Sequence, residues 1–171
     1  GVLHAAKPVQ PDPTVRLRKI YDSSVAKYQN AYKRDAGAWA VSYIQTLKAL
    51  QEQKQKSGDL DGWSTAKKEL DRFLSAPTLT EELVSASTGD LRTTQAQNLE
   101  RRNNVTAKKH AQILDLKKKY AERLSRIQKE MTRAGNFDIA FRAKNEIERV
   151  NGSPEVAAAE AYVASKAEAQ R

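Results

Sequence analysis

The segment from Tyr43 to Phe73 recurs 77 positions later in the chain, as the segment from Tyr120 to Val150. The identical pairs include Tyr43/Tyr120, Leu47/Leu124, Gln51/Gln128, Gly58/Gly135, Asp61/Asp138, Ala66/Ala143, Lys67/Lys144, Glu69/Glu146 and Arg72/Arg149. A register kept over this length indicates two copies of one supersecondary unit, and this duplication constrains the fold more than any other feature. The repeated unit has no reactive group of its own.

Each copy predicts a long helix. No proline interrupts the stretch from Pro13 to Lys56, and Asp12 stands where an N-cap belongs. Its apolar residues recur in steps of four, four and three, an eleven-residue period that is typical of a helical seam. The second copy keeps these steps from Val105 to Met131, with Lys109 as the one interruption. Pairing within one chain or between two chains satisfies such a seam equally, and the long 75–89 connection favours pairing within one chain.

A glycine turn and a short returning helix complete each copy. Gly58 and Gly135 predict the ends of the long helices, because glycine accepts the left-handed conformation of a C-terminal cap. We expect Asp61 and Asp138 to cap short helices over about 62–74 and 139–150. We also expect Leu60 and Phe137 to fill the inside of the bends.

The predicted fold class is therefore all-α: an elongated helical bundle or coiled coil made of two tandem copies of a long-helix/short-helix hairpin. It divides into an extended N-terminal arm (1–11), a first helical hairpin (12–76), a linker (77–89), a second helical hairpin (90–152) and a C-terminal alanine-rich helix (153–171). We expect these parts to form one elongated domain.

Composition excludes several kinds of chemistry. The chain of 171 residues has no cysteine, so disulfides, thiolate metal sites and cysteine nucleophiles are excluded. Its two histidines are His4 and His110, and no nucleophile with a base, paired carboxylates or phosphate-binding loop accompanies them. We therefore expect no catalytic residue, cofactor, metal or small-molecule substrate. No apolar run is long enough for a transmembrane helix.

Three patterns have a functional and a structural interpretation. Asp59 with Asp61 resembles part of a calcium loop, but the further oxygen ligands are missing, so capping is favoured. The repeated Lys67, Glu69 and Arg72 fit a charged recognition edge, and we favour a solvated face with a modest ion pair. The aromatic series at helical spacing fits a stacking platform, and we favour a seam whose hydroxyls stay in water. The series comprises Tyr21, Tyr28, Tyr32, Trp39 and Tyr43.

Positive charge gathers in the second copy. Residues 99–150 contain fourteen basic and seven acidic residues, a net +7 of the formal +9 of the whole chain. A field of this sign attracts nucleic acid, acidic glycans or anionic lipid head groups, although no element for reading bases is present. The alternative is a merely solvated face. The candidate polyanion-binding residues are Arg101, Arg102, Lys108, Lys109, Lys117, Lys118 and Lys119.

The Gly-Asp-Leu-Asp-Gly stretch at 58–62 follows Tyr43 and Leu47 and precedes the segment from Ala66 to Phe73. With these flanks it resembles coiled-coil segments of exported proteins from planctomycete and verrucomicrobial bacteria. The resemblance covers about residues 40–75 closely and 117–150 loosely, where Asn136, Ile139 and Val150 depart from it. It implies an extracytoplasmic helical module, periplasmic or secreted, and implies no activity.

The chain begins at Gly1 rather than methionine, so we expect a processed or trimmed product. Its first residues fit the end of a signal peptide that runs into a mature arm, or an artificial boundary. The leading functional hypothesis is a non-enzymatic scaffold or protein-interaction module that binds a protein partner or itself. The alternative hypothesis is a polyanion-binding protein that uses the basic second hairpin.

Overall fold

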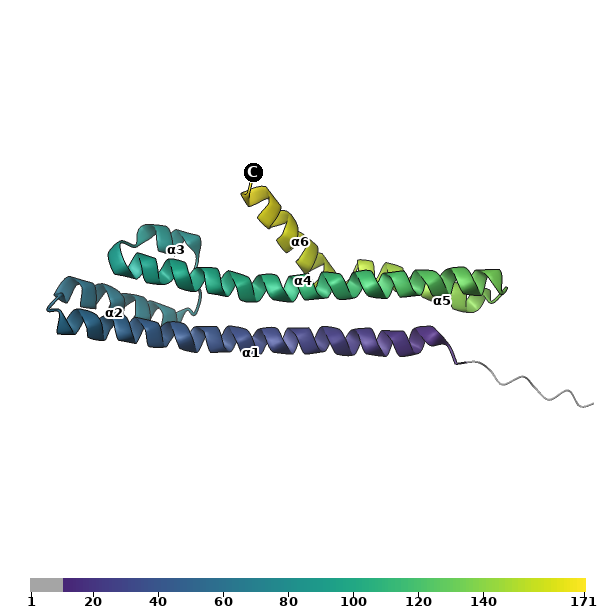
Figure 1. Ribbon diagram of the computed structural model, residues 1–171, viewed down its shortest axis with the longest axis horizontal. Helices are drawn as coiled ribbons and strands as arrows, with labels where there is room; N and C mark the ends of the chain where they lie inside the picture. The colour runs from purple at the N-terminus through teal and green to yellow at the C-terminus, as the bar shows by residue number, and fades with distance from the viewer. Residues whose placement is uncertain (1–10) are drawn as a thin grey trace, which may run out of the picture. The chain divides into compact units, whose positions relative to one another are not determined.

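The structure is a computed structural model that describes residues 11–171, and it is all-α in this range. The predicted arm at 1–11 falls almost wholly outside the described residues. The helices are α1 (Pro13–Lys56), α2 (Leu60–Ser75), α3 (Glu81–Ala86), α4 (Gly89–Arg133), α5 (Phe137–Asn151) and α6 (Pro154–Ala169) (Figure 1). The bounds of α1 are the predicted ones. Asp12 caps it, because its Oδ1 accepts hydrogen bonds from the backbone N–H of Thr14 at 2.9 Å and from its hydroxyl at 2.7 Å.

Both long helices end at a glycine in the left-handed conformation. The φ angles are 73° at Gly58 and 74° at Gly135, and no non-glycine residue in the described range has a positive φ. An added Cβ would meet no atom within 4 Å at either position, so glycine is required there by the backbone and not by a close neighbour. The two copies therefore share the same turn, as the repeat predicts.

The predicted caps of the short helices, Asp61 and Asp138, are wrong by two residues. Asp59 accepts a hydrogen bond from the N–H of Gly62 at 2.8 Å, and Asn136 accepts one from the N–H of Ile139 at 3.4 Å. A single residue after the glycine is enough to redirect the chain, so α2 and α5 start earlier than expected. Asp61 and Asp138 instead lie in the first helical turn, where negative charge is favourable beside exposed N–H groups.

The expectation that Leu60 and Phe137 fill the bends is also wrong. Their side chains are 75% and 57% exposed. As the first residues of α2 and α5 they lie on the side of the helix opposite its buried face, given 3.6 residues per turn. The buried faces consist of Ala66, Glu69, Leu70 and Phe73 in α2, and of Ala140, Ala143, Glu146 and Val150 in α5.

The chain separates into two compact units that do not coincide with the two sequence repeats. Unit 2 is the continuous stretch 29–109, and among the described residues unit 1 combines 11–28 with 110–171. Each unit therefore contains one glycine turn, the short helix that follows this turn, and the N-terminal part of the other long helix.

In unit 2, α2 runs back along the second half of α1, and α3 lies beside the start of α4 (Figure 1). An aromatic cluster is at the centre of its core. The Tyr43 ring meets the Phe73 ring edge-on at a centroid distance of 4.8 Å and stacks with the Trp39 ring at 5.7 Å. The other buried apolar residues are Leu47, Leu50, Ala66, Leu70, Leu79 and Leu91.

In unit 1, α5 runs back along α4, and the start of α6 packs on the same core. The rings of Tyr21 in α1 and Tyr120 in α4 stack, with centroids 4.4 Å apart and planes 14° apart. The other buried residues of this core cluster are Leu17, Val25, Ile113, Leu124, Ala143, Val150, Val156 and Ala159. Only the first two turns of α6 contribute to this core, and Val163 beyond them is 49% exposed.

The long helices pair antiparallel within the single chain, as favoured from the sequence. In unit 2, Lys54 Nζ lies 2.6 Å from Asp90 Oδ2, and the Trp39 indole N–H donates to the Asn98 carbonyl at 2.8 Å. Further towards the start of α1, the Tyr32 hydroxyl accepts a hydrogen bond from Arg102 at 2.9 Å. Residue numbers thus rise along α4 as they fall along α1.

Candidate functional site

Each unit contains a buried tyrosine and a buried glutamate that are hydrogen-bonded to each other, and a partly exposed arginine that is hydrogen-bonded to the glutamate. The Tyr43 hydroxyl donates to Glu69 Oε1 at 2.9 Å, and Arg72 donates to both oxygens of that carboxylate at 2.8 and 2.6 Å. In unit 1 the Tyr120 hydroxyl donates to Glu146 Oε1 at 2.8 Å. Arg149 completes this second network, donating to the same carboxylate at 2.8 and 2.6 Å.

These networks correct two sequence interpretations. Glu69 and Glu146 are only 7% and 8% exposed, so these two carboxylates do not belong to a solvated face. The expected ion pair between Glu69 and Arg72 is present, at 2.6 Å. The hydroxyls of Tyr43 and Tyr120 also do not stay in water, because each is buried against a carboxylate. A carboxylate can be buried at these positions because an arginine and a tyrosine supply three hydrogen bonds to it.

The electrostatics of the networks oppose proton transfer near neutral pH. Burial, followed by the adjacent Glu146, raises the pKa of the Tyr120 phenol, and burial and Glu69 raise the pKa of Tyr43. Burial alone would raise the pKa of Glu146, but hydrogen bonds from Arg149 and Tyr120 lower it below its ordinary value. General acid and base catalysis works best with a pKa near the working pH, and the pKa values of Tyr43, Tyr120 and Glu146 are all shifted away from it.

Among residues 11–171, no group of three or more carboxylates and histidines is arranged to hold a metal ion. Asp59, which resembles a ligand of a calcium loop in the sequence, and its counterpart Asn136 in the second copy both cap helices. In addition, Lys54 Nζ lies 3.4 Å from Asp59 Oδ2, which places a positive charge where a cation would have to bind. The capping interpretation is confirmed at these two turns.

Four of the seven predicted polyanion-binding residues belong to unit 2, and two of these are engaged with an aromatic ring. The Arg102 guanidinium lies 5.2 Å and the Lys109 ammonium 4.0 Å from the centre of the Tyr32 ring. Arg101 makes a long hydrogen bond of 3.4 Å to the Ser42 hydroxyl, and Lys108 is exposed. Cation–π contacts stabilise the seam and leave Arg102 and Lys109 only partly accessible.

The other three, Lys117, Lys118 and Lys119, belong to unit 1. Lys117 lies 3.7 Å from Glu160 of α6, and Lys119 lies 2.9 Å from Asp115 one turn earlier. Lys118 is exposed. The seven residues are therefore divided between two compact units, and two of the three lysines have a carboxylate neighbour.

A groove between α1 and α4 in unit 1 gathers arginines that the sequence analysis did not select. It has a volume of about 660 Å³ and is lined by Pro13, Arg16, Leu17, Ile20, Arg123, Arg126, Ile127 and Glu130. Antiparallel pairing brings the first two turns of α1 to the last turns of α4. Leu17, Ile20 and Ile127 form an apolar floor, and the charged lining residues are the three arginines and Glu130.

Six of the arginines of unit 1 fall into two sets. Arg18, Arg142 and Arg149 have carboxylate partners at 3.6, 2.8 and 2.6 Å, namely Asp22, Asp12 and Glu146. By contrast, Arg16, Arg123 and Arg126 make no ion pair or hydrogen bond with any residue that the structure describes. Three unpaired guanidinium groups around one groove form the surface of this unit that is best prepared for an anion.

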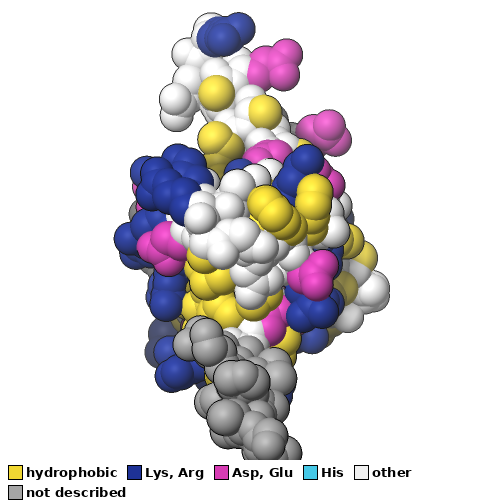
Figure 2. Space-filling model, turned by 90° about the vertical axis from the view of Figure 1, so that its right-hand side faces the viewer, with side chains coloured by type: hydrophobic (Ala, Val, Ile, Leu, Met, Phe, Trp, Pro, Cys, Tyr) yellow, Lys and Arg dark blue, Asp and Glu magenta, His cyan; other side chains and the backbone are white. Residues whose placement is uncertain are grey.

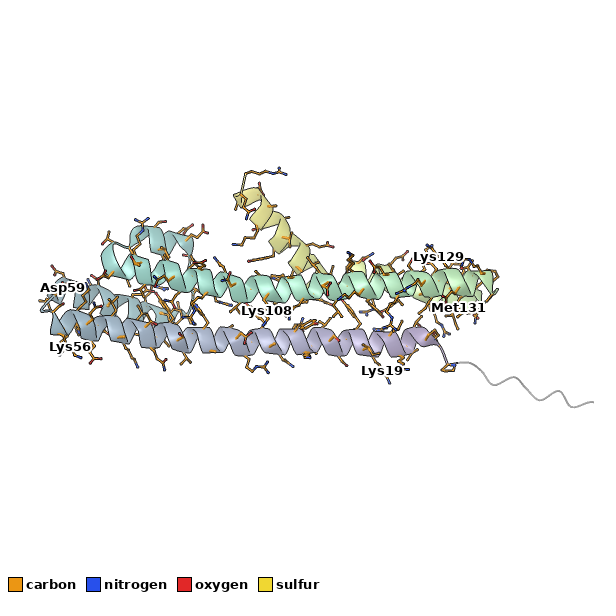
Figure 3. The ribbon with its side chains drawn as sticks, viewed as in Figure 1. Lys19, Lys56, Asp59, Lys108, Lys129 and Met131 are labelled. Carbon is orange, nitrogen blue, oxygen red and sulfur yellow. The ribbon has the colours of Figure 1, made fainter. Side chains whose placement is uncertain are left out.

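One sequence signal could have found this groove. Arg123 and Arg126 are within the +7 count, but Arg16 is outside the range over which charge was counted. Aligning the two apolar stripes antiparallel would have placed Arg16 next to them. Figure 3 shows how sharply the faces of α4 differ here: Met131 lies on the side towards α1, whereas Lys129 points away from it.

Comparisons with family models, curated proteins and solved structures found no match to this chain. Within the described residues, none of the helices combines the length and the apolar character needed to cross a bilayer.

Proposed function

We propose that this chain is a helical interaction module that acts by binding an acidic protein segment in the arginine groove of unit 1, and not by catalysis. The observation that supports it is the set of three unpaired arginines, Arg16, Arg123 and Arg126, around an apolar floor. Arginine beside exposed apolar surface is the composition that protein interfaces favour.

The shape of the groove favours a helical partner. Its lining runs from Pro13 to Ile20 on α1 and from Arg123 to Glu130 on α4, which is about 10 Å along each helix axis. An amphipathic helix of two to three turns lies in such a channel, with apolar side chains three and four residues apart on the floor. Its carboxylates would accept paired hydrogen bonds from the arginines.

The resemblance to exported bacterial coiled-coil segments supports an extracytoplasmic location for this module, with a scaffolding role. Neither the compartment nor the partner enters the experiment below, which depends only on the chemistry of the groove.

The direct test uses a synthetic helical peptide of leucine and glutamate in amphipathic order, together with a scrambled peptide of the same composition. We expect the ordered peptide to bind at least tenfold more tightly than the scrambled one. Binding should fall at least tenfold when Arg16, Arg123 and Arg126 become glutamine. A matched control removes three exposed charges from unit 2, by K33Q, R34Q and K48Q, and should bind normally. Equal binding of both peptides would contradict the proposal.

The second candidate function is binding of a polyanion such as a heparin-like polymer or single-stranded nucleic acid. The observation that favours it is the same unpaired arginine set, together with Lys118 and the other exposed cations of the second copy. Such binding falls steeply as salt rises and falls further when Lys117, Lys118 and Lys119 become glutamine.

A substitution of Ile20 distinguishes the two candidate functions. Ile20 is 47% exposed on the groove floor, so Ile20→Ser removes apolar surface while every charge stays. A helical partner should lose affinity with this variant, whereas a polyanion held by charge alone should not. Measuring the variant against both the amphipathic peptide and heparin distinguishes the two functions.

A further inference from the structure

The first two turns of α5 expose two phenylalanines on one face. Phe137 and Phe141 are 57% and 60% exposed. Residues four apart lie one above the other on a helix, so the two rings form one apolar patch directly after the Gly135 turn. Two aromatic side chains side by side in water are unusual for a surface without a binding role.

The first repeat shows that the fold does not require this patch. Phe137 corresponds to Leu60 and Phe141 to Ser64, and the two turns share the same glycine conformation. The first repeat therefore keeps the same helix start with a polar residue at the second position. Phe141 is an addition at this turn that packing does not explain.

Basic side chains outnumber acidic ones around the patch, although Asp138, one turn before Phe141, is exposed there as well. Lys144 lies one turn beyond Phe141 on the same side of α5, and Arg133 ends α4 just before the turn. Lys144, Arg133 and Lys129 are exposed, and none forms an ion pair or hydrogen bond with any residue from 11 to 171. Figure 2 looks onto this end of unit 1, where hydrophobic side chains lie next to Lys and Arg side chains.

Charge distinguishes between the possible occupants of the patch. The exposed charges around the turn that make no ion pair with a described residue are Lys129, Arg133 and Lys144 against Glu130 and Asp138, so the turn is net positive. A second copy of it would bring two surfaces of like net charge together, which disfavours self-pairing. An anionic bilayer surface offers negative head groups to these cations and an apolar boundary to the rings. Aromatic side chains are enriched at that boundary for the same reason.

We propose that the α4–α5 turn anchors the protein to the surface of an anionic membrane. Phe137 and Phe141 insert at the head-group boundary, and Lys129, Arg133 and Lys144 lie against the lipid phosphates. The anchor rests on the surface and does not cross the bilayer, in accordance with the lack of a spanning helix in the described range. This inference goes beyond the proposed function, because none of these five residues lines the arginine groove.

The experiment is co-sedimentation of the whole chain with vesicles of phosphatidylcholine, with and without 30% phosphatidylglycerol. We expect binding to the anionic vesicles only, and at least a tenfold loss of partitioning for F137S/F141S. The matched control, L60S/L74S, removes two apolar side chains that are 75% and 59% exposed on α2, and should bind normally. The single variant F141S places at position 141 the residue that the first repeat has at the equivalent position, Ser64. This variant therefore tests the patch with a residue that the same turn already accepts.

A second measurement reports insertion directly. With Phe137→Trp, the difference between the emission spectra of this variant and the parent chain should shift to shorter wavelength with anionic vesicles. No binding to anionic vesicles, or equal loss with F137S/F141S and L60S/L74S, would overturn the proposal. Concentration-dependent dimerisation that F137S/F141S abolishes would assign the patch to a second copy and would also overturn it. Peptide binding by the arginine groove should be unchanged in F137S/F141S, so each proposal can fail without the other.

Discussion

Tyr120 and Glu146 are joined by a buried hydrogen bond of 2.8 Å, and the same bond joins their counterparts in the other repeat at 2.9 Å. In each case the two residues are 26 positions apart, on the long helix and on the short helix that returns along it. The bond therefore fixes the position of the short helix after the glycine turn.

Tyr120→Phe should lower the free energy of unfolding by about 1–2 kcal/mol, because it removes a donor from a buried carboxylate. Urea denaturation followed by circular dichroism measures this change. Tyr28→Phe is the control, since Tyr28 is half-buried on α1 and has no hydrogen bond from its hydroxyl in the described structure. Equal stability of Y120F and the parent chain would contradict a stabilising role for the bond.

Glu146→Gln should destabilise unit 1 at pH 7 by about 1–3 kcal/mol, because Arg149 loses the carboxylate that accepts its two hydrogen bonds and keeps only Asp22, at 3.5 Å, as a charged partner. The difference should disappear in acid. The pKa of Glu146 is lowered in the fold, so its contribution is complete above the ordinary value of 4.5 and is lost as the pH falls through the folded value.

Denaturation midpoints of E146Q and the parent chain between pH 3 and pH 7 test this dependence. Glu148→Gln, at an exposed position two residues away, is the control and should shift the midpoint little at any pH. If the difference in denaturation midpoint between E146Q and the parent chain became larger below pH 4.5, the pH dependence would be opposite to the one expected.

Gly135→Ala should cost about 1–2 kcal/mol of stability, because an L-residue is strained at a φ of 74° although no neighbour blocks its Cβ. Gly37→Ala should have the opposite sign. Gly37 lies inside α1 with open space around it, so alanine there should stabilise the helix by about 0.8–1 kcal/mol. Thermal denaturation of the two variants should move the midpoint in opposite directions, and a shift of both in the same direction would contradict the conformational argument.

Ala143→Leu should destabilise by about 1–3 kcal/mol, since Ala143 has no exposed surface and lies within the unit 1 core. The repeat has alanine at the equivalent position, Ala66, which is also fully buried. Ala26→Leu, on the exposed side of α1, is the control and should leave the denaturation midpoint nearly unchanged. A tolerated leucine at 143 would show that the short helix does not pack as closely as the burial indicates.

The helices were predictable because their signals are local. Proline, glycine and helix periodicity define α1 from Pro13 to Lys56 without any knowledge of its partners. The cap positions were misplaced because Asp59 and Asp61 are both good capping residues, and only the backbone path decides between them.

The candidate groove was less predictable because it depends on how two distant segments align. Arg16 and Arg123 become neighbours only once α1 and α4 are paired antiparallel. Burial of Glu69 was missed for a related reason: a charge in a helix indicates solvent unless its hydrogen-bond donor, here a tyrosine 26 positions earlier, is already known.

The two ends of the continuous stretch that forms unit 2 lie close together. At one end the Lys109 ammonium lies over the ring of Tyr32, which is near the other end. A chain with this topology can acquire or discard such a stretch by a single genetic insertion or deletion, with its two cut ends already adjacent. Length variation in relatives of this protein would then be accommodated as paired increments on both long helices, and not as loops at their tips.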